Sequence, residues 1–147
     1  MNDLLSQKKS ILFLCPGGIG DNIRFSGLVK SVLGALPHAR AFLVTSSSAA
    51  ADVCWDRTRF KKVWFLSNHS LILNKLKTGL SIRRHKPDLI VAAAGLKPDS
   101  VVKFARFVGR PDLAGSGIEE SWRGKYLFHT DHRPGDNEYD SNEALPG

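Results

Sequence analysis

The sequence predicts one α/β domain in which a parallel sheet carries helices on both faces. Short, continuously apolar runs are typical of strands buried on both sides, and several occur along the chain. Between them lie segments whose apolar residues recur every three or four positions, as in amphipathic helices. This alternation predicts parallel strands joined by right-handed crossovers, a Rossmann-like arrangement. The length of 147 residues suits a single domain of this kind.

The first half of the chain predicts two strands and two helices. Ile11–Cys15 is the first buried strand, and Ala41–Thr45 is the second. The helix expected from Asp21 to Pro37 has an apolar face made of Ile23, Phe25, Leu28, Val29, Val32, Leu33 and Leu36. The small, Ala-rich segment 46–55 predicts a short helix capped by one of its serines.

The second half repeats the pattern. Lys62–Leu66 and Asp88–Ala92 predict the third and fourth strands. Residues 71–84 predict a surface helix that carries Ile72, Leu76 and Leu80 on one side. Pro98 opens a last helix, whose buried stripe is expected to be Val101, Phe104, Ala105 and Val108.

The remaining segments set the expected domain boundaries. Residues 109–124 are rich in Gly, Ser and charge and predict irregular structure, followed by a short strand over Lys125–Thr130. The expected organisation is an N-terminal tail over 1–10, the Rossmann-like domain over 11–130 and an acidic linker or tail over 131–147.

Composition excludes several classes of protein. No apolar run approaches the ~18 residues that span a bilayer, and the run before Pro16 is too short for a secretory signal. Cys15 and Cys54 stand in apolar surroundings, so buried thiols are expected rather than a disulfide or a metal site. A cytoplasmic location follows, with contact at the inner membrane face as a further expectation.

The net charge is +7 and is unevenly distributed, because residues 126–147 carry −4 and residues 1–125 carry +11. The basic residues form no single stripe along the sequence, and no nucleic-acid-binding motif is present. The sequence therefore predicts no nucleic-acid partner. Anionic small molecules or an acidic membrane surface suit the basic body better.

The segment after the first strand, Pro16–Asn22, is the candidate functional loop and is called the glycine loop below. Its glycines are expected to allow positive φ angles and close approach to a ligand, and the next helix offers unpaired N–H groups. The spacing matches neither a dinucleotide fingerprint nor a P-loop. Asp21 suits two roles: capping the helix, or accepting a proton from a substrate hydroxyl.

The strand, glycine loop and helix over Ser10–Ala39 resemble the opening of glycosyltransferase family 9, the lipopolysaccharide heptosyltransferases and their relatives. Phe60–Leu66 and Arg83–Val91 resemble later segments of that family. The resemblance implies the N-terminal, acceptor-binding half of a two-domain, B-type glycosyltransferase. The small, apolar segment Ala92–Lys97 departs from the family, which often has an acidic or glutamine-containing segment there.

The resemblance also implies a reaction and its residues. Asp21 would be the catalytic base of an inverting transfer that uses no metal and no cofactor. The substrate-binding residues would be Gly17, Gly18, Ile19, Gly20, Asn22 and Arg24. The acceptor would be a cell-envelope glycan or an anionic glycolipid, and a second domain would bind the nucleotide-sugar donor. The chain is therefore expected to be inactive without that domain.

Two other functions remain open from the residues. The chain could be a non-enzymatic, Rossmann-like module that binds a sugar or a phosphate through the glycine loop. An independent nucleotide enzyme is the third alternative. Thr45–Ser48 argues against it, because an acidic residue is expected at the end of the second strand of a dinucleotide-binding domain.

Overall fold

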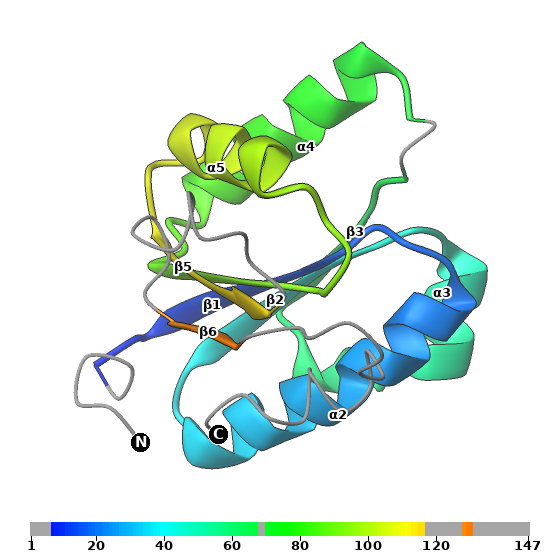
Figure 1. Cartoon of the computed structure of the whole chain (residues 1–147), viewed down its shortest axis with the longest axis vertical. Helices are drawn as coiled ribbons and strands as arrows, with labels where there is room; N and C mark the ends of the chain where they lie inside the picture. Colours follow the sequence, from blue (N-terminus) through cyan, green and yellow to red (C-terminus); the bar gives the residue numbers. More distant parts are fainter. Residues whose placement is uncertain (1–6, 68–69, 117–127, 131–147) are drawn as a thin grey trace.

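The computed structural model describes residues 7–67, 70–116 and 128–130. Within these residues six strands form one sheet in the order β3-β2-β1-β4-β5-β6, and every neighbouring pair is parallel (Figure 1). The predicted parallel α/β architecture is confirmed. The strands are β1 (Ser10–Cys15), β2 (Arg40–Thr45), β3 (Lys62–Phe65), β4 (Leu89–Ala92), β5 (Asp112–Ser116) and β6 (Phe128–Thr130).

Helices cover both faces of the sheet, as the alternation of strands and helices predicts. One face carries α2 (Ile19–Ala35) and α3 (Ser48–Cys54), followed by the 3₁₀ turn η1 (Arg57–Arg59). The opposite face carries α4 (Ile72–Arg84) and α5 (Pro98–Phe107) (Figure 1). Two hydrophobic clusters result, one on each side of the sheet.

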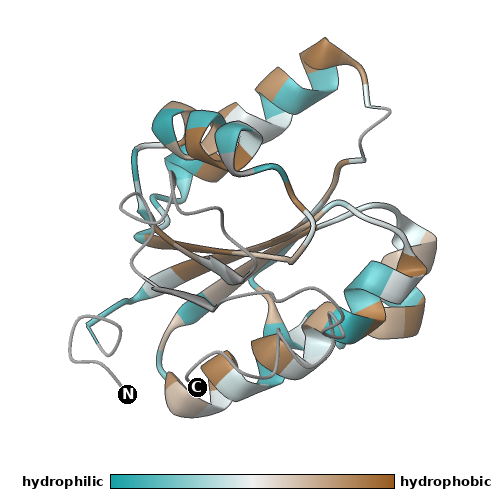
Figure 2. Cartoon of the chain, in the orientation of Figure 1, coloured by the Kyte–Doolittle hydropathy of each residue, from teal (hydrophilic) through white to brown (hydrophobic). Residues whose placement is uncertain are grey.

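Strand β1 is the centre of both clusters. Ile11, Phe13 and Cys15 face the cluster under α2, whereas Leu12 and Leu14 face the cluster under α4 and α5. All six residues of the strand are buried, which explains why the run Ile11–Cys15 is continuously apolar rather than alternating. Figure 2 shows hydrophobic and hydrophilic residues alternating along the helices that flank the sheet.

The expected elements of the first half are confirmed with small shifts at their ends. Helix α2 begins at Ile19, two residues before Asp21. Ser47 caps α3, because its Oγ accepts a hydrogen bond of 3.1 Å from the backbone N–H of Ala50. Ile23, which was expected on the buried face of α2, is 51% exposed.

Strand β5 corrects the prediction of irregular structure over residues 109–124. Leu113 is the only large apolar residue of this strand, so the sequence carries little strand signal. Pairing with β4 stabilises the strand in spite of its low strand propensity, since Ile90 lies opposite Leu113 and Val91 opposite Ala114. The predicted last strand is observed as β6 over Phe128–Thr130. Residues 1–6, 117–127 and 131–147, with the predicted acidic tail, lie outside the described residues.

Helix α4 contacts the core through a side that the apolar pattern did not predict. Ile72, Leu76 and Leu80 are 75%, 44% and 48% exposed, while Gly79 and Ile82 are buried. Gly79 allows α4 to approach α5, because a Cβ added there would lie 2.4 Å from Cε1 of the Phe107 ring. Helix α4 has an exposed apolar side, but neither it nor any other helix in the described residues is long and apolar enough to cross a membrane.

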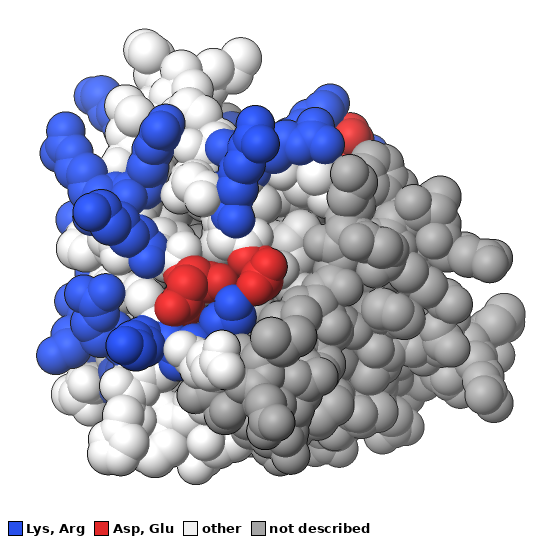
Figure 3. All heavy atoms as spheres, turned by 90° about the vertical axis from the view of Figure 1, so that its left-hand side faces the viewer, with Lys and Arg blue, Asp and Glu red and all other residues white. Residues whose placement is uncertain are grey.

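The fold gathers basic residues that are scattered along the sequence. The amino edge of the sheet holds the first residues of β2 and β3 and the last turns of α4 and α5, which include Arg40, Lys62, Arg83, Arg84 and Arg106. Figure 3 views this edge and shows Lys and Arg side chains around a small acidic centre. The sequence shows no basic stripe, but the folded surface gathers basic residues at this edge.

Replacement of Gly79 tests the contact between α4 and α5. We expect Gly79→Val to lower the free energy of unfolding by about 2 kcal/mol, because the added methyl groups overlap the Phe107 ring. Gly34→Val in α2 is the matched control, since a Cβ there meets nothing within 4 Å. Urea denaturation measures both changes, and equal effects of the two substitutions would contradict this account of Gly79.

Candidate active site

The candidate site lies where the connections of the sheet diverge. Strand β2 follows β1 in the chain and pairs with it on one side. Strand β4 comes later in the chain and pairs with β1 on the other side. Such a switch point leaves a crevice outside the carboxyl ends of the two central strands. A cavity of about 150 Å³, the edge cavity, occupies this position and is lined by Cys15, Pro16, Gly17, Asp21, Ala93, Ala94, Gly95 and Leu96.

Asp21 lines the edge cavity with a carboxylate that is oriented at both oxygens. Its Oδ2 accepts a hydrogen bond of 3.1 Å from the backbone N–H of Gly18, which caps the first turn of α2. Its Oδ1 accepts from Nη2 of Arg24 at 2.6 Å, one turn along the helix. The Asp21 side chain remains 40% exposed. The carboxylate is thus fixed in direction and still accessible from solvent.

Gly17 is required by the position of this carboxylate. A Cβ at Gly17 would lie 2.5 Å from Oδ2 of Asp21, so any other residue would displace the carboxylate or the loop. The positive φ expected of the loop glycines is not observed, because the described glycines with positive φ are Gly95 and Gly109. Gly18 instead has an extended backbone, and both Gly18 and Gly20 have open space where a Cβ would stand.

Asn22 is fully buried directly behind the loop. Its Nδ2 donates to the carbonyl oxygens of Gly17 at 3.1 Å and Gly18 at 2.8 Å. Its Oδ1 accepts from Thr45 Oγ1 at 2.7 Å and from Trp55 Nε1 at 2.9 Å. Both donors and both acceptor positions of the amide are therefore used inside the protein.

Two further residues lie near Asp21: Ile19, which was predicted as a site residue, and Cys15, which was predicted as a buried thiol. Ile19 is 45% exposed, and its carbonyl oxygen lies 3.7 Å from Sγ of Cys54, which donates to it. Cys15 lines the edge cavity but is buried, and this burial raises the pKa of its thiol to about 12. Cys15 therefore stays protonated at neutral pH and does not supply a nucleophilic thiolate.

A second cavity of about 200 Å³, the neighbouring cavity, adjoins the first at Pro16 and Leu96. It opens toward α4 and α5, and its walls include Ser67, Lys75 and Ser100. Lys75 was not predicted as a site residue, because in the sequence it is one of several lysines on a surface helix. The packing of α4 against the sheet places Lys75 at the carboxyl edge, and the sequence does not predict this packing.

A further part of the edge cavity was noted in the sequence only as a departure from the family and not as a site. It consists of Ala93–Leu96, the segment that directly follows β4, with Gly95 at φ 89°. The signal was available, since ligand-binding loops follow the strands of a parallel sheet, but strand order was needed to place this loop beside β1. Among the described residues, no group of three or more His, Cys, Asp or Glu side chains could hold a metal ion.

Solved structures that share this fold include two glycosyltransferases. The glycosyltransferase of family 9 from Veillonella parvula DSM 2008 matches 95% of this chain and 40% of its own, with a TM-score of 0.71 and 16% identity. The E. coli heptosyltransferase WaaC with ADP-2-deoxy-2-fluoro heptose matches 91% of this chain and 46% of its own, with a TM-score of 0.62 and 12% identity. The resemblance predicted from the sequence is confirmed at the level of the fold.

A third solved structure extends the range of proteins that share this fold. TubZ of the Clostridium botulinum phage c-st matches 94% of this chain and 56% of its own, at a TM-score of 0.52 and 11% identity. No protein-family model and no curated protein matches the sequence. This chain spans less than half the length of the two glycosyltransferases. A shared sheet supports several functions, so function has to be argued from the site.

Substitution of Asn22 tests its role in holding the glycine loop. We expect Asn22→Ala to lower the free energy of unfolding by about 3 kcal/mol, because it leaves several buried polar groups without partners. Thr45→Val removes a single donor to the same amide and should cost about 1 kcal/mol. Urea denaturation distinguishes the two, and a loss below that of Thr45→Val would contradict the proposed role of Asn22.

Proposed function

We propose that this chain is the acceptor-binding, N-terminal domain of a metal-independent, inverting glycosyltransferase of the heptosyltransferase type. The observation that carries the proposal is the oriented, accessible carboxylate of Asp21 at the switch point of the sheet. The similarity of the fold to that of two glycosyltransferases supports it. The acceptor would be a cell-envelope glycan or glycolipid, and the donor a nucleotide sugar bound mainly by a further domain.

Asp21 acts in this reaction as the general base. As the acceptor oxygen forms its bond to the anomeric carbon of the donor sugar, the bond from that carbon to the nucleotide diphosphate breaks. The hydroxyl proton passes to a carboxylate oxygen of Asp21, and the diphosphate leaves with the bonding electron pair. A single positioned base contributes about 10²–10⁴ to the rate, and alignment of the two substrates contributes much of the rest.

The other predicted site residues position this base. Arg24 donates to Oδ1 and the N–H of Gly18 donates to Oδ2, so both contacts orient the carboxylate at the edge cavity. Asn22 fixes the carbonyl groups of Gly17 and Gly18 from inside, which replaces the direct substrate contact expected from the resemblance. Gly20 and Ile19 remain on the open side of the first helical turn, where an acceptor can contact them.

A transfer assay tests the role of Asp21. The chain is mixed with a separately produced donor-binding domain of a family 9 enzyme, ADP-heptose and a lipopolysaccharide-core acceptor. ADP-heptose is chosen because the WaaC structure holds a fluoro analogue. We expect transfer only in the mixture, and a kcat about 10²–10⁴ lower for Asp21→Asn, which keeps an oxygen to cap the helix.

The matched control for that assay is Asp52→Asn, a change of the same kind at a carboxylate that is 68% exposed on α3. It should leave kcat unchanged. Acceptor binding without transfer in any mixture would favour a non-enzymatic sugar-binding module. Tight binding of the nucleotide sugar by the isolated chain would contradict the proposed division between acceptor and donor domains.

Contact with an anionic membrane surface is part of the proposed function, and α4 is the element suited to it. Leu73, Leu76 and Leu80 are 68%, 44% and 48% exposed and follow one another at helical spacing. Lys77 lies among them, and Arg83 and Arg84 end the helix. Exposed apolar residues with flanking cations are typical of helices that lie on anionic bilayers. Docking by α4 would bring the neighbouring cavity close to a lipid-linked acceptor.

Vesicle sedimentation tests this contact. We expect the chain to bind vesicles that contain phosphatidylglycerol more tightly than vesicles of phosphatidylcholine alone. Leu73→Ser with Leu76→Ser should weaken binding about tenfold, because two exposed leucines no longer enter the bilayer. Val53→Ser is the control, since Val53 is 67% exposed on α3. Equal binding of the double variant and wild type would contradict the role of α4.

A further inference from the structure

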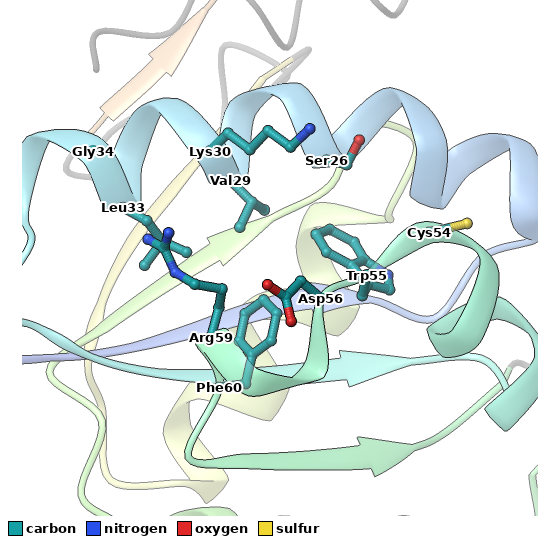
Figure 4. Close-up of a pocket in the computed structure, with 10 residues that line it drawn as sticks. All are labelled: Ser26, Val29, Lys30, Leu33, Gly34, Cys54, Trp55, Asp56, Arg59 and Phe60. Carbon is teal, nitrogen blue, oxygen red and sulfur yellow. The ribbon is translucent and has the colours of Figure 1, made fainter.

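A third cavity, the α2 cavity, opens on the other helical layer of the protein. It has a volume of about 220 Å³ and lies between α2 and the segment Cys54–Phe60 (Figure 4). Among the described residues, it shares no lining side chain with the edge cavity or the neighbouring cavity. The proposed transfer reaction therefore leaves it without a role.

The floor of the α2 cavity is apolar and aromatic. Trp55 and Phe60 meet edge to face, with ring centroids 5.9 Å apart and an interplanar angle of 84°. Val29 and Leu33 of α2 complete the floor, and a Cβ at Gly34 would meet nothing within 4 Å. A cavity of about 150 Å³ accepts benzene, so the available volume suits a molecule of one or two rings.

Charged side chains stand at the rim. Lys30 comes from α2 and Arg59 from η1, and Figure 4 shows the Arg59 guanidinium turned toward Leu33. Asp56 also lines the cavity, but its Oδ1 accepts from the N–H and the Oγ1 of Thr58, at 3.0 and 2.5 Å. These hydrogen bonds hold the pKa of Asp56 below its usual value. The two cations outnumber this anion, so the rim favours a ligand with a negative group.

The floor is connected to the glycine loop by hydrogen bonds. Trp55 Nε1 donates to Oδ1 of Asn22 at 2.9 Å, and Asn22 donates to the carbonyls of Gly17 and Gly18. A molecule that presses on the indole ring thus acts, through one side chain, on the segment that holds Asp21. We propose that the α2 cavity is a second ligand site, specific for small aromatic carboxylates, and that its occupancy is coupled to the glycine loop.

Titration of the whole chain with 2-naphthoate, followed by ¹H–¹⁵N NMR, tests the proposal. Saturable shifts are expected at the amides of Cys54–Phe60 and the middle of α2. Coupling predicts shifts with the same midpoint at the Trp55 indole N–H and the Gly18 amide. The neutral analogue 2-naphthalenemethanol should bind about fivefold more weakly, as expected for the loss of one exposed charge pair.

Three variants locate the binding. Gly34→Leu fills the open space over α2 and should abolish the shifts, whereas Ser31→Leu, an exposed position on the same helix outside the cavity, should leave them unchanged. Arg59→Gln should weaken binding about fivefold. Thermal unfolding verifies that each variant is folded.

Several results would overturn the inference. Absence of saturable shifts, their persistence in Gly34→Leu or their appearance on α4 instead would exclude this cavity as the site. Equal affinity for the neutral analogue would exclude the carboxylate class. Shifts confined to the cavity, with the Trp55 indole and Gly18 unmoved, would exclude the coupling.

Discussion

The buried amide of Asn22 is the interaction on which the candidate site depends. It joins the carboxyl end of β2 through Thr45, the end of α3 through Trp55, and the glycine loop through Gly17 and Gly18. A buried primary amide has two donors and two acceptor positions, and here every one has a partner. Such a saturated network defines a single arrangement, because any displacement of the loop leaves a buried polar group unpaired. The internal partners of Asn22 therefore determine the position of the loop.

The helix geometry converts this internal anchor into an external functional group. Asp21 and Asn22 are neighbours in the first turn of α2, and successive helical residues point about 100° apart. When Asn22 points into the protein, Asp21 is directed toward the edge cavity, where Gly18 and Arg24 orient its oxygens. Capping and catalysis are compatible in this arrangement, since each oxygen accepts one hydrogen bond and retains a further lone pair for a substrate proton.

The sequence predicts those features that arise from burial on both sides of the sheet, and it misses those that arise from contacts between distant segments. Strands β1, β2 and β4 each contain a continuous apolar run, so the sequence predicts them. Strand β5 depends on pairing with β4 and carries one large apolar residue. Asp21 can be predicted as a candidate site residue from its place after a strand and a glycine turn. The role of Asn22 is not, because partners 23 and 33 residues away define it. The exposure of the apolar side of α4 could not be predicted either, because periodicity identifies an apolar side of a helix but not whether that side packs against the core.

The size of the cavities bears on how the proposed reaction would be divided. Sites that enclose a ligand generally have volumes of about 300–1,000 Å³. The edge cavity and the neighbouring cavity measure about 150 and 200 Å³ and adjoin at Pro16 and Leu96, so together they suit one acceptor group rather than an acceptor and a nucleotide sugar. Both glycosyltransferases with this fold have more than half of their length outside the matched region. In-line transfer requires the donor to face Asp21 from across the carboxyl edge. In this proposal a second structural unit on that side supplies the contacts that the leaving diphosphate needs.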